Sequence, residues 1–534
     1  MKKTASTEAT GCTMEGGQDA GALMTAYRRR DFIKAGVATA ALPFALREQP
    51  ALALAPQLGP ASPPSHYLTH FGIDSEQIRR VITAALSRGG DHCDVYFEHK
   101  VFNYIGVEDK AVNRAYTGVD FGAGIRVVQG DQTGYSFTEE ITPKALEQAA
   151  RTAANIAESA GQKAPVQFKP REAARYYPIE VSWETVRADR KVPLLAEIND
   201  KVFALDKRII KCGVHFDDEF RYILIARSDG QLVVDFQPMT ATYVTCVAEQ
   251  AGRREDAFFG LSGRYGFEFY TPERLDRLAR EAVRRTTLMF EAVKPAAGEM
   301  PVVLAPGTSG ILLHEAIGHG MEADFNRKKI SIFSDKIGQR VAEKFVSIVD
   351  DGTNRNLRGS VNVDDEGNPT ERTMLVENGI LRSYLHDYIS AAFYRVKSTG
   401  NGRRESFRFA PVPRMRNTYM LPGPHKPEEV IGSVKRGLYA EEFTNGEVFI
   451  GAGDFTFYVK LGKLIEDGKL TRPVKDINII GNGPEVLKRI TMVADDLKHG
   501  EGGGMCGKNG QGVPVQMGLP TVKVSAITVG GVSS

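Results

Sequence analysis

The sequence predicts an α+β protein, with an N-terminal mixed α/β domain followed by a mainly antiparallel β domain with a few helices. Three observations predict this class. The 534 residues exceed the size at which one hydrophobic core usually stops growing, so two or more domains are expected. Helix and strand patterns alternate before about residue 295, whereas strands separated by tight turns dominate after it. The 54 glycines also favour turn-rich β structure.

Residues 1–55 have the features of a twin-arginine signal peptide. Consecutive arginines in residues 28–34 precede an apolar run over residues 35–46, and Ala-Leu-Ala sequences within residues 51–55 provide candidate cleavage sites. The alternative is an amphipathic helix or a membrane anchor, but this run is interrupted by Pro43 and is too short to span a bilayer. We therefore expect export to the periplasm or the extracellular space, and no integral membrane segment in the mature chain.

The composition of the expected mature chain argues against some classes of protein. Without residues 1–55 the chain has 61 Lys and Arg residues and 61 Asp and Glu residues, so its net charge is near zero. Nucleic acid is therefore not an expected partner, because such proteins usually carry a strong positive charge. The four remaining cysteines also lack the close spacing of a small disulfide scaffold.

The predicted N-terminal domain, residues 56–295, mixes helices and strands. Apolar residues at helical spacing or Ala-rich runs predict helices over residues 75–86, 143–160 and 272–293. Short apolar runs predict strands over residues 93–97, 124–128 and 135–137. The sequence from Lys294 to Gly298 cannot continue a helix and therefore predicts the domain boundary.

The predicted C-terminal domain, residues 296–534, has the pattern of antiparallel β structure. Asn378-Gly379 and Asp467-Gly468 each separate two strand-like runs, which is the strongest short-range signal for a hairpin. Two helical intervals, at about residues 427–438 and 484–497, interrupt the strands. This second half is the expected location of the chemistry.

The candidate catalytic motif runs from His314 to His319, with Glu315 beside the first histidine. It follows a strand and a turn, and we expect a helix capped by Thr308 or Ser309. Neutral imidazoles bind zinc, and a glutamate beside a ligand can take a proton from zinc-bound water, as in H-E-x-x-H peptidases. Here the spacing is one residue longer, H-E-x-x-x-H.

This extra residue conflicts with a regular helix. Five positions on a straight α-helix place His314 and His319 about 140° apart, where they could not share a metal. Either a π-bulge distorts the helix, or the helix ends near Gly318 and His319 turns back from non-helical backbone. The sequence leaves both open, together with the alternative that the two histidines are ordinary helix residues.

A catalytic zinc ion usually needs a third protein ligand, and Cys506 is the best candidate. It lies in a glycine-rich segment, residues 500–512, interpreted as a loop whose backbone can approach another group closely. An inert thiol in a surface loop is the alternative. In that case Glu322 and Asp324, the acidic residues nearest to the motif, are the replacement ligands.

Three other motifs do not support a site. Residues 502–508 match a phosphate-binding loop, but Asn509 replaces the required Ser or Thr and no helix follows. The His, Cys and Asp residues within 92–99 flank a strand, whose alternate residues point to opposite faces. Residues 403–405 could bind a peptide carboxylate, but a charged loop is the more frequent explanation.

The motif and several other segments resemble the TldD/PmbA family, and specifically its catalytic TldD subunit. After residues 314–320, the similarity continues in the family order through residues 364–367, 401–406, 414–422 and 505–508. It covers roughly residues 90–530. In these segments the chain resembles a family of zinc metallopeptidases.

The resemblance implies Zn²⁺ bound by His314, His319 and Cys506, with Glu315 as the catalytic general base. It also implies hydrolysis of unstructured peptides held in an extended conformation, where strand addition supplies affinity with little sequence preference. The expected partner is a TldE-like subunit without the metal motif, or a second copy in a homodimer. The leader departs from the family, whose familiar members are cytoplasmic.

Two alternatives belong to other functional classes. The first is a non-catalytic peptide-binding or scaffold subunit of a TldD/TldE-like complex, against which the intact His-Glu-His set argues. The second is an exported metal-dependent oxidoreductase, since many twin-arginine cargoes carry redox cofactors. No flavin or nucleotide motif in the sequence supports it.

Overall fold

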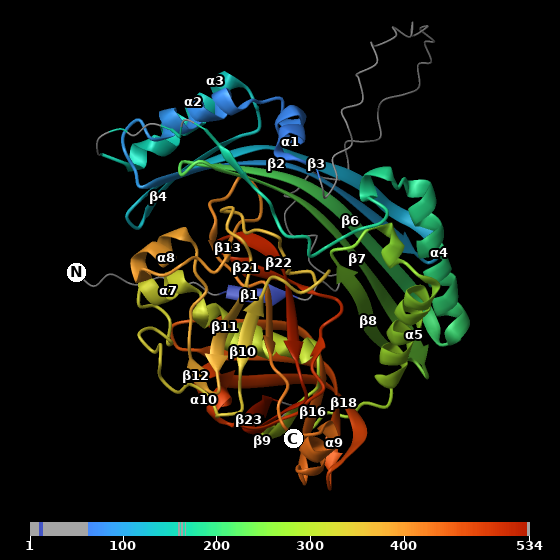
Figure 1. Ribbon diagram of the computed structural model, residues 1–534. Coiled ribbons are helices and arrows are strands. Elements are labelled where there is room, and N and C mark those ends of the chain that lie inside the picture. Colours follow the sequence, from blue (N-terminus) through green and yellow to red (C-terminus); the bar gives the residue numbers. More distant parts are fainter. Residues whose placement is uncertain (1–9, 14–61, 159–160, 162–163, 166, 531–534) are drawn as a thin grey trace, which may run out of the picture.

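A long arched sheet covers a second, mostly β body in the computed structural model, which describes residues 10–13, 62–158, 161, 164–165 and 167–530 (Figure 1). The first body mixes helices with one sheet, and the second consists mainly of strands. The predicted α+β class is confirmed. The predicted twin-arginine motif and apolar run, residues 28–46, lie outside the described residues.

The arched sheet has seven strands in the order β4-β3-β2-β6-β7-β5, with β8 on β7. Its strands are β2 His92–Glu108, β3 Ala111–Gln129, β4 Gln132–Thr138, β5 Lys169–Arg171, β6 Ile209–Arg227, β7 Gln231–Gln250 and β8 Arg253–Gly263. Only β5 pairs in parallel. The strands are longer than predicted, because exposed stretches such as residues 111–117 have no apolar pattern to reveal them.

The helices α1–α5 lie outside the arch, and the second body lies inside it (Figure 1). They are α1 Pro64–Phe71, α2 Ser75–Ala85, α3 Pro143–Ala153, α4 Ala188–Leu205 and α5 Pro272–Leu288. Asp74 and Gln77 form a capping box that starts α2, as its sequence favours. Helix α5 ends before the predicted Val293, because the backbone N–H of Val293 donates to Pro473 of the second body.

The second body is built on a 14-stranded sheet. Its larger strands are β9 Gly298–Leu304, β10 Ile348–Asp351, β11 Arg372–Glu377, β15 Asn417–Met420, β16 Arg436–Phe449, β17 Asp454–Glu466, β18 Lys469–Asn482, β19 Ile490–Val493, β21 Gly504–Lys508, β22 Gln511–Leu519 and β23 Val522–Gly530. Its shorter strands are β1 Thr10–Thr13, β12 Ile380–Leu381 and β20 Lys498–His499, whereas β13 Gly402–Arg403 and β14 Val412–Pro413 pair only with each other in a separate two-stranded sheet. Strands β16, β17, β18, β23 and β9 pair in a closed ring.

The predicted hairpin turns of this body are confirmed, and its predicted helices are too long. Asn378-Gly379 joins β11 to β12 and Asp467-Gly468 joins β17 to β18, with positive φ at all four residues. Helices α8 Tyr388–Tyr394, α9 Pro427–Gly432 and α10 Gly483–Lys488 cover its edges. The two predicted intervals end early because the residues that follow α9 and α10 enter β16 and β19 and pair in the sheet.

Buried charges join the two bodies. Arg126 of β3 donates to Asp94 of β2 and to Glu366 of the second body, at 2.6 and 2.7 Å. Arg404 reaches back to Asp94, with 3.1 Å between Nη2 and Oδ1. In the charged loop expected at residues 403–405, the side chains of Arg403 and Arg404 are buried.

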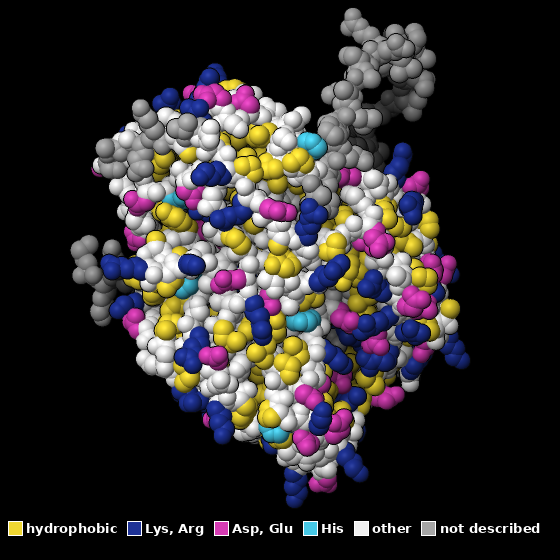
Figure 2. Space-filling model, in the orientation of Figure 1, with side chains coloured by type: hydrophobic (Ala, Val, Ile, Leu, Met, Phe, Trp, Pro, Cys, Tyr) yellow, Lys and Arg dark blue, Asp and Glu magenta, His cyan; other side chains and the backbone are white. Residues whose placement is uncertain are grey.

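The apolar residues form a separate main cluster in each body, one within residues 67–283 and the other within residues 302–529. The domain ranges 56–295 and 296–534 stay predictions. The face seen in Figure 2 intersperses Lys and Arg with Asp and Glu, without a field of one sign. Among the described residues, no helix has both the length and the apolar character that a membrane crossing requires.

Candidate metal centre

The candidate motif lies in a short run of helical turns that follows β9. These are the 3₁₀ turn η4 Thr308–Gly310, α6 Ile311–Leu313, the π-helix η5 His314–Gly318, the 3₁₀ turn η6 His319–Met321 and α7 Ala323–Arg327. The expected capping by Thr308 or Ser309 is wrong. The run begins after Gly307 without a side-chain cap, because the Ser309 hydroxyl donates to the Ala305 carbonyl instead.

The π-helix removes the geometric conflict between the two histidines. The N–H of His319 donates to the carbonyl of His314, which is the i to i+5 bond of a π-helix. A wider turn rotates each residue by less than an α-helix does, so five positions bring the two side chains to one face. Their ring centroids lie 5.0 Å apart. Of the two distortions left open by the sequence, the π-bulge is the one present.

At Gly318 the run packs closely against Met415, in the segment between β14 and β15. A Cβ at this position would lie 2.0 Å from the Met415 sulfur, so no larger residue fits without a shift. Met415 is itself buried, and its carbonyl accepts from Arg403 at 2.7 Å. Glycine here serves close approach, not a positive φ.

Cys506 lies 187 residues after His319 in the sequence. It lies in β21, not in a loop as expected, because its segment pairs with β22 across the Asn509-Gly510 turn. Its Sγ is 3.4 Å from Nε2 of His319. One ligand atom each from His314, His319 and Cys506 lies within 4.8 Å of the others, and all three residues are buried.

These three residues fit a zinc ion. Two imidazole nitrogens and a thiolate match the preference of zinc, and ligands on one tetrahedral zinc at about 2.0–2.3 Å lie roughly 3.5 Å apart. The distance between Cys506 and His319 has this value. Both ring nitrogens of the buried His314 lack a hydrogen-bond partner among the described residues, and a bound cation would satisfy one of them.

The surroundings of Cys506 and His319 favour a negatively charged Cys506 beside a positively charged His319. Burial raises the pKa of the Cys506 thiol, but the positive charges of His319 and Arg414 outweigh it and hold the pKa well below its usual value. Burial lowers the pKa of His319, but Cys506 and Glu322 outweigh it and raise the pKa well above its usual value. These two directions favour a Cys506 thiolate paired with a His319 imidazolium.

Glu315 lies beside the ligand cluster and opposite β16. Its Oε2 is 3.9 Å from Nε2 of His319, and the residue is fully buried. Its Cγ lies 3.3 Å from the point that a Cβ on Gly446 would occupy. A carboxylate so placed can accept or return a proton next to the metal position.

Comparisons with known proteins agree with this site. Three domain models described as PmbA/TldA metallopeptidase match the chain: domain 1 over residues 93–157, the central domain over 182–290 and the C-terminal domain over 297–531. A relative named metalloprotease TldD homolog from Haemophilus influenzae is 38% identical over 87% of this chain and 98% of its own. The chain belongs to the TldD/PmbA metallopeptidase family.

Two further relatives extend the comparison. A protein of Saccharolobus solfataricus named zinc metalloprotease TldD homolog is 28% identical over 85% of this chain and 99% of its own. The crystal structure of TldE from Thermococcus kodakarensis matches the fold of this family member with a TM-score of 0.66, at 19% identity, over 85% of this chain and 99% of that one. The family and the names of these relatives indicate that the chain is a metallopeptidase.

Sequence reasoning missed the residues that orient His319 in this metallopeptidase. Glu322 Oε2 lies 3.0 Å from Nδ1 of His319, so Nε2 is directed towards Cys506. Lys508 donates to Glu322 at 3.1 Å and to Asp324 at 2.7 Å. Glu322 and Asp324 thus lie behind the cluster, not in it. The spacing in the sequence could have indicated Lys508. It is two residues after Cys506, so in a strand the two side chains lie on the same face of β21.

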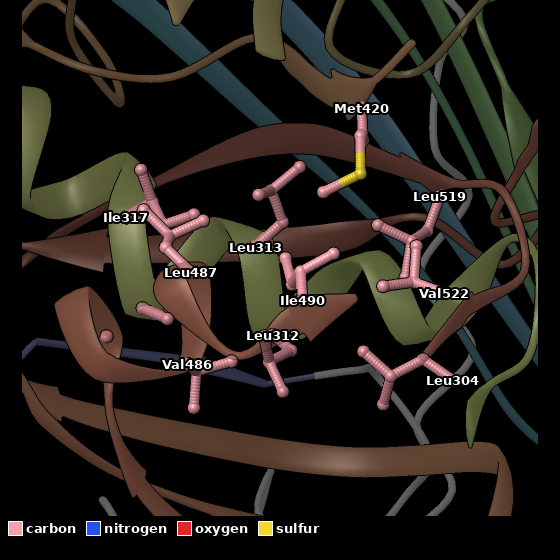
Figure 3. Close-up of a pocket in the computed structure, with 12 residues that line it drawn as sticks. Leu304, Leu312, Leu313, Ile317, Met420, Val486, Leu487, Ile490, Leu519 and Val522 are labelled. Carbon is pink, nitrogen blue, oxygen red and sulfur yellow. The ribbon is translucent and has the colours of Figure 1, made fainter. Parts of the chain in front are cut away.

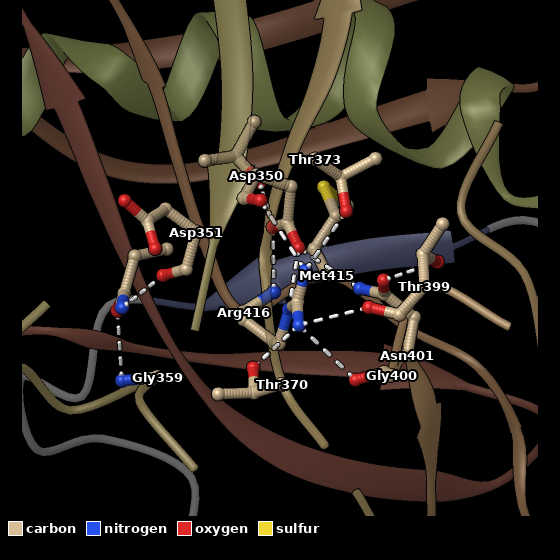
Figure 4. Close-up of polar contacts among 12 residues, drawn as sticks. Asp350, Asp351, Gly359, Thr370, Thr373, Thr399, Gly400, Asn401, Met415 and Arg416 are labelled. Atoms are coloured by element: carbon tan, nitrogen blue, oxygen red, sulfur yellow. Dashed lines mark hydrogen bonds and ion pairs between the residues drawn. The ribbon is translucent and has the colours of Figure 1, made fainter. Parts of the chain in front are cut away.

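A second buried network holds the segment that packs against the π-helix. Arg416 donates to Asp350 of β10 through its backbone N–H and its Nε, both at 2.8 Å, and to Thr370 through Nη1 at 2.5 Å (Figure 4). Burial raises the pKa of Asp350, but Arg416 outweighs it and lowers the pKa below its usual value. This ion pair fixes the backbone next to Met415, which contacts Gly318.

A small cavity adjoins the same helical run but is not a substrate site. Its volume is about 10 Å³, and it is lined by apolar side chains that include Leu312, Leu313 and Ile317 (Figure 3). Such a space is at the lower limit for one water molecule and offers no polar partner. The substrate of this family member must therefore approach the metal position by another route.

Proposed function

We propose that this metallopeptidase is a zinc enzyme that hydrolyses unstructured peptides, with zinc held by His314, His319 and Cys506 and with Glu315 as general base. The observation that carries the proposal is the convergence of the three ligand atoms within 4.8 Å, with the Glu315 carboxylate beside them. The donor set suits zinc, and the word zinc in the name of the Saccharolobus relative supports this choice of metal.

The residues of this chain have separate roles in the proposed reaction. A bound zinc ion would lower the pKa of a water molecule and polarise the scissile carbonyl. Glu315 accepts the proton of the attacking water and then donates it to the leaving amine. Glu322 holds the Nδ1 side of His319, so that its Nε2 stays on the metal side.

The peptide is proposed to pass between β16 and β21 as an added strand. Strand β1 Thr10–Thr13 lies between β16 and β21. Because each is antiparallel to β1, they point in the same direction, and they do not pair with each other. Backbone pairing on both sides would give affinity with little dependence on side chains. Gly446 of β16 packs against the Phe457 ring and lies next to Glu315, so a peptide paired at this position would place its scissile bond near the base.

Two further proposals concern the setting of the enzyme. The similarity to a TldE structure supports a partner subunit of that kind, or a second copy of this chain. The arginines at residues 28–30 and the apolar run after them support export by the twin-arginine route. Changing Arg28 and Arg29 to Lys is expected to retain the full-length precursor in the cytoplasm, as fractionation would measure. Unaltered export would contradict this proposal.

The catalytic proposal is tested with Glu315→Gln. The amide keeps the shape of the side chain but cannot accept the proton, so cleavage of an unstructured peptide should fall by about 10²–10⁴-fold while zinc content stays the same. Glu485→Gln, an exposed change on α10, is the matched control. A wild-type rate in Glu315→Gln would place the base elsewhere. Zinc and peptide binding without cleavage by the wild type would favour the scaffold alternative.

A further inference from the structure

The chain's own N-terminal residues form a strand next to the candidate metal centre. This strand, β1 Thr10–Thr13, lies between β21 and β16 and is the dark-blue strand near the centre of Figure 1. It is antiparallel to both neighbours. The backbone of Cys12 is in register with Cys506 on one side and with Gly446 on the other.

Without β1, the two neighbouring strands would present open edges to each other. On this side of β16, β9 pairs with residues 438–440, and β1 pairs further along with residues 445–448. β17 pairs with that second stretch on the opposite side, and within the described residues no strand other than β1 pairs with it on this side. An open edge exposes a row of N–H and C=O groups that readily pair with an extended chain. The gap is therefore one strand wide and suits a single extended peptide.

The register places β1 at the reactive position. Cys506 is a candidate ligand, and Gly446 lies beside Glu315, the candidate base. The backbone at residue 12 therefore runs between a ligand-bearing strand and the strand next to the base. A substrate could not pair with the same edges at the same time.

We propose that residues 10–13 are an intramolecular inhibitory strand that keeps the precursor inactive by occupying its peptide groove. This inference rests on the proposed function. A tethered segment has an effective concentration in the millimolar range, so a dilute peptide competes poorly with it. The strand precedes the predicted cleavage sites at residues 51–55, so removal of the leader would remove the inhibitor and open the groove after export.

The test uses proline to break the strand within the full-length chain. Proline lacks the N–H and is poorly tolerated in a strand that is paired on both sides. Gly11→Pro and Cys12→Pro are each expected to lower the apparent KM for an added unstructured peptide by at least about tenfold, with kcat unchanged. Ala5→Pro, outside β1, is the control and should match the parent. Equal apparent KM values in all four proteins would overturn the inference.

A binding measurement separates this inference from the proposed function. The same proteins, each carrying Glu315→Gln, are titrated into a fluorescent peptide of residues 8–15 in which Ser replaces Cys12. The two strand variants should bind it at least about tenfold more tightly than the parent and Ala5→Pro. Equal affinity, or no measurable binding by any protein, would overturn the inhibitory strand. Suppose instead that the strand variants bind the peptide more tightly, but the same variants with Glu315 intact and zinc bound do not cleave it. This result would overturn the peptidase proposal alone.

Discussion

The His319 imidazole has a neighbour on each of its two ring nitrogens. Nε2 lies 3.4 Å from Cys506 and Nδ1 lies 3.0 Å from Glu322. Lys508 in turn neutralises Glu322 and holds the pKa of that carboxyl below its usual value despite burial, with help from His319. The imidazole is thus fixed in orientation before any metal binds.

Replacing the sulfur ligand is expected to disable the site. Cys506→Ser removes the thiolate, so zinc affinity and peptide cleavage should fall together by more than the roughly 10–100-fold typical of an outer-shell change. Zinc content is measured after dialysis, beside a cleavage assay. Cys93→Ser, Cys212→Ser and Cys246→Ser, all buried cysteines outside the cluster, are the controls. Full zinc content with normal cleavage in Cys506→Ser would remove this residue from the site.

Changing Glu322 tests the orientation of His319. Glu322→Gln keeps a hydrogen-bonding group beside Nδ1 but removes its negative charge, so zinc affinity should fall about 10–100-fold. Competition with a chelator measures this. Asp324→Asn is matched to it, because Asp324 also contacts Lys508 but not His319, and its loss should be smaller. Equal losses in the two variants would show that Lys508, and not His319, transmits the effect.

At the scale of elements, the π-helix depends on close packing of the helical run, residues 308–327, against its neighbours. Its five residues are all buried, and apolar residues of the run adjoin α10 and β19 around the small cavity in Figure 3. Met415 fills the space beside Gly318 and is held by the network around Arg416. The helical distortion is therefore supported by packing that comes from several strands.

Gly318→Ala is expected to disturb this packing. The added methyl group would meet the Met415 sulfur, so the protein should lose about 1–3 kcal/mol of stability and bind zinc more weakly as the π-helix shifts. The melting temperature and zinc affinity measure the two effects. Gly432→Ala at the end of α9 is the control, because a Cβ there meets nothing within 4 Å. Unchanged zinc affinity in Gly318→Ala would mean that the π-helix does not depend on this contact.

At the scale of the whole molecule, buried charges connect the arched sheet to the metallopeptidase body. Asp94, Arg126, Glu366 and Arg404 are all buried at this contact. Removing Asp94, which pairs with both Arg126 and Arg404, should cost about 3–5 kcal/mol, because the charges of the two arginines would lose this buried partner. The contact also holds residues 401–406, whose neighbour Arg414 donates to the carbonyl of Cys506. The relative position of the two bodies is thereby linked to the site.

Glu366 gives this contact a dependence on pH. Burial, with the nearby Asp387 and Asp364, outweighs Arg126 and raises the pKa of Glu366 to about 8. In the unfolded chain the carboxyl ionises near 4.5, so between pH 4.5 and 8 the folded state keeps a proton that the unfolded state lacks. The free energy of unfolding should therefore fall with rising pH across this window, by up to about 1.4 kcal/mol per pH unit.

Glu366→Gln removes the titrating group and tests this dependence. From pH 5 to pH 8 the wild type should lose more stability than the variant does, as urea denaturation at the two values would measure. Glu377→Gln, at the partly exposed end of β11, is the control and should follow the wild type. Parallel stability curves for the wild type and Glu366→Gln would show that Glu366 stays ionised in the folded protein.

Local sequence patterns determined the class of fold and the candidate residues of the site. Alternation of apolar residues, Asn-Gly and Asp-Gly turns and the capping residues of α2 act over a few neighbouring positions, so they can be interpreted from the sequence. The residue types of the His314 to His319 motif indicate zinc chemistry for the same reason. The exposed halves of the long strands gave no such signal, because their side chains follow no apolar period.

Only the tertiary structure decided which distortion joins the histidines and which distant residues complete the site. Cys506 is 187 positions from His319, and Lys508 is 186 positions from Glu322, so no local pattern connects them. The insertion of residues 10–13 between β21 and β16 likewise depends on two edges that exist only after the sheet has formed. Spacing along the chain encodes local geometry, whereas these contacts are chosen by packing and pairing between segments remote in sequence.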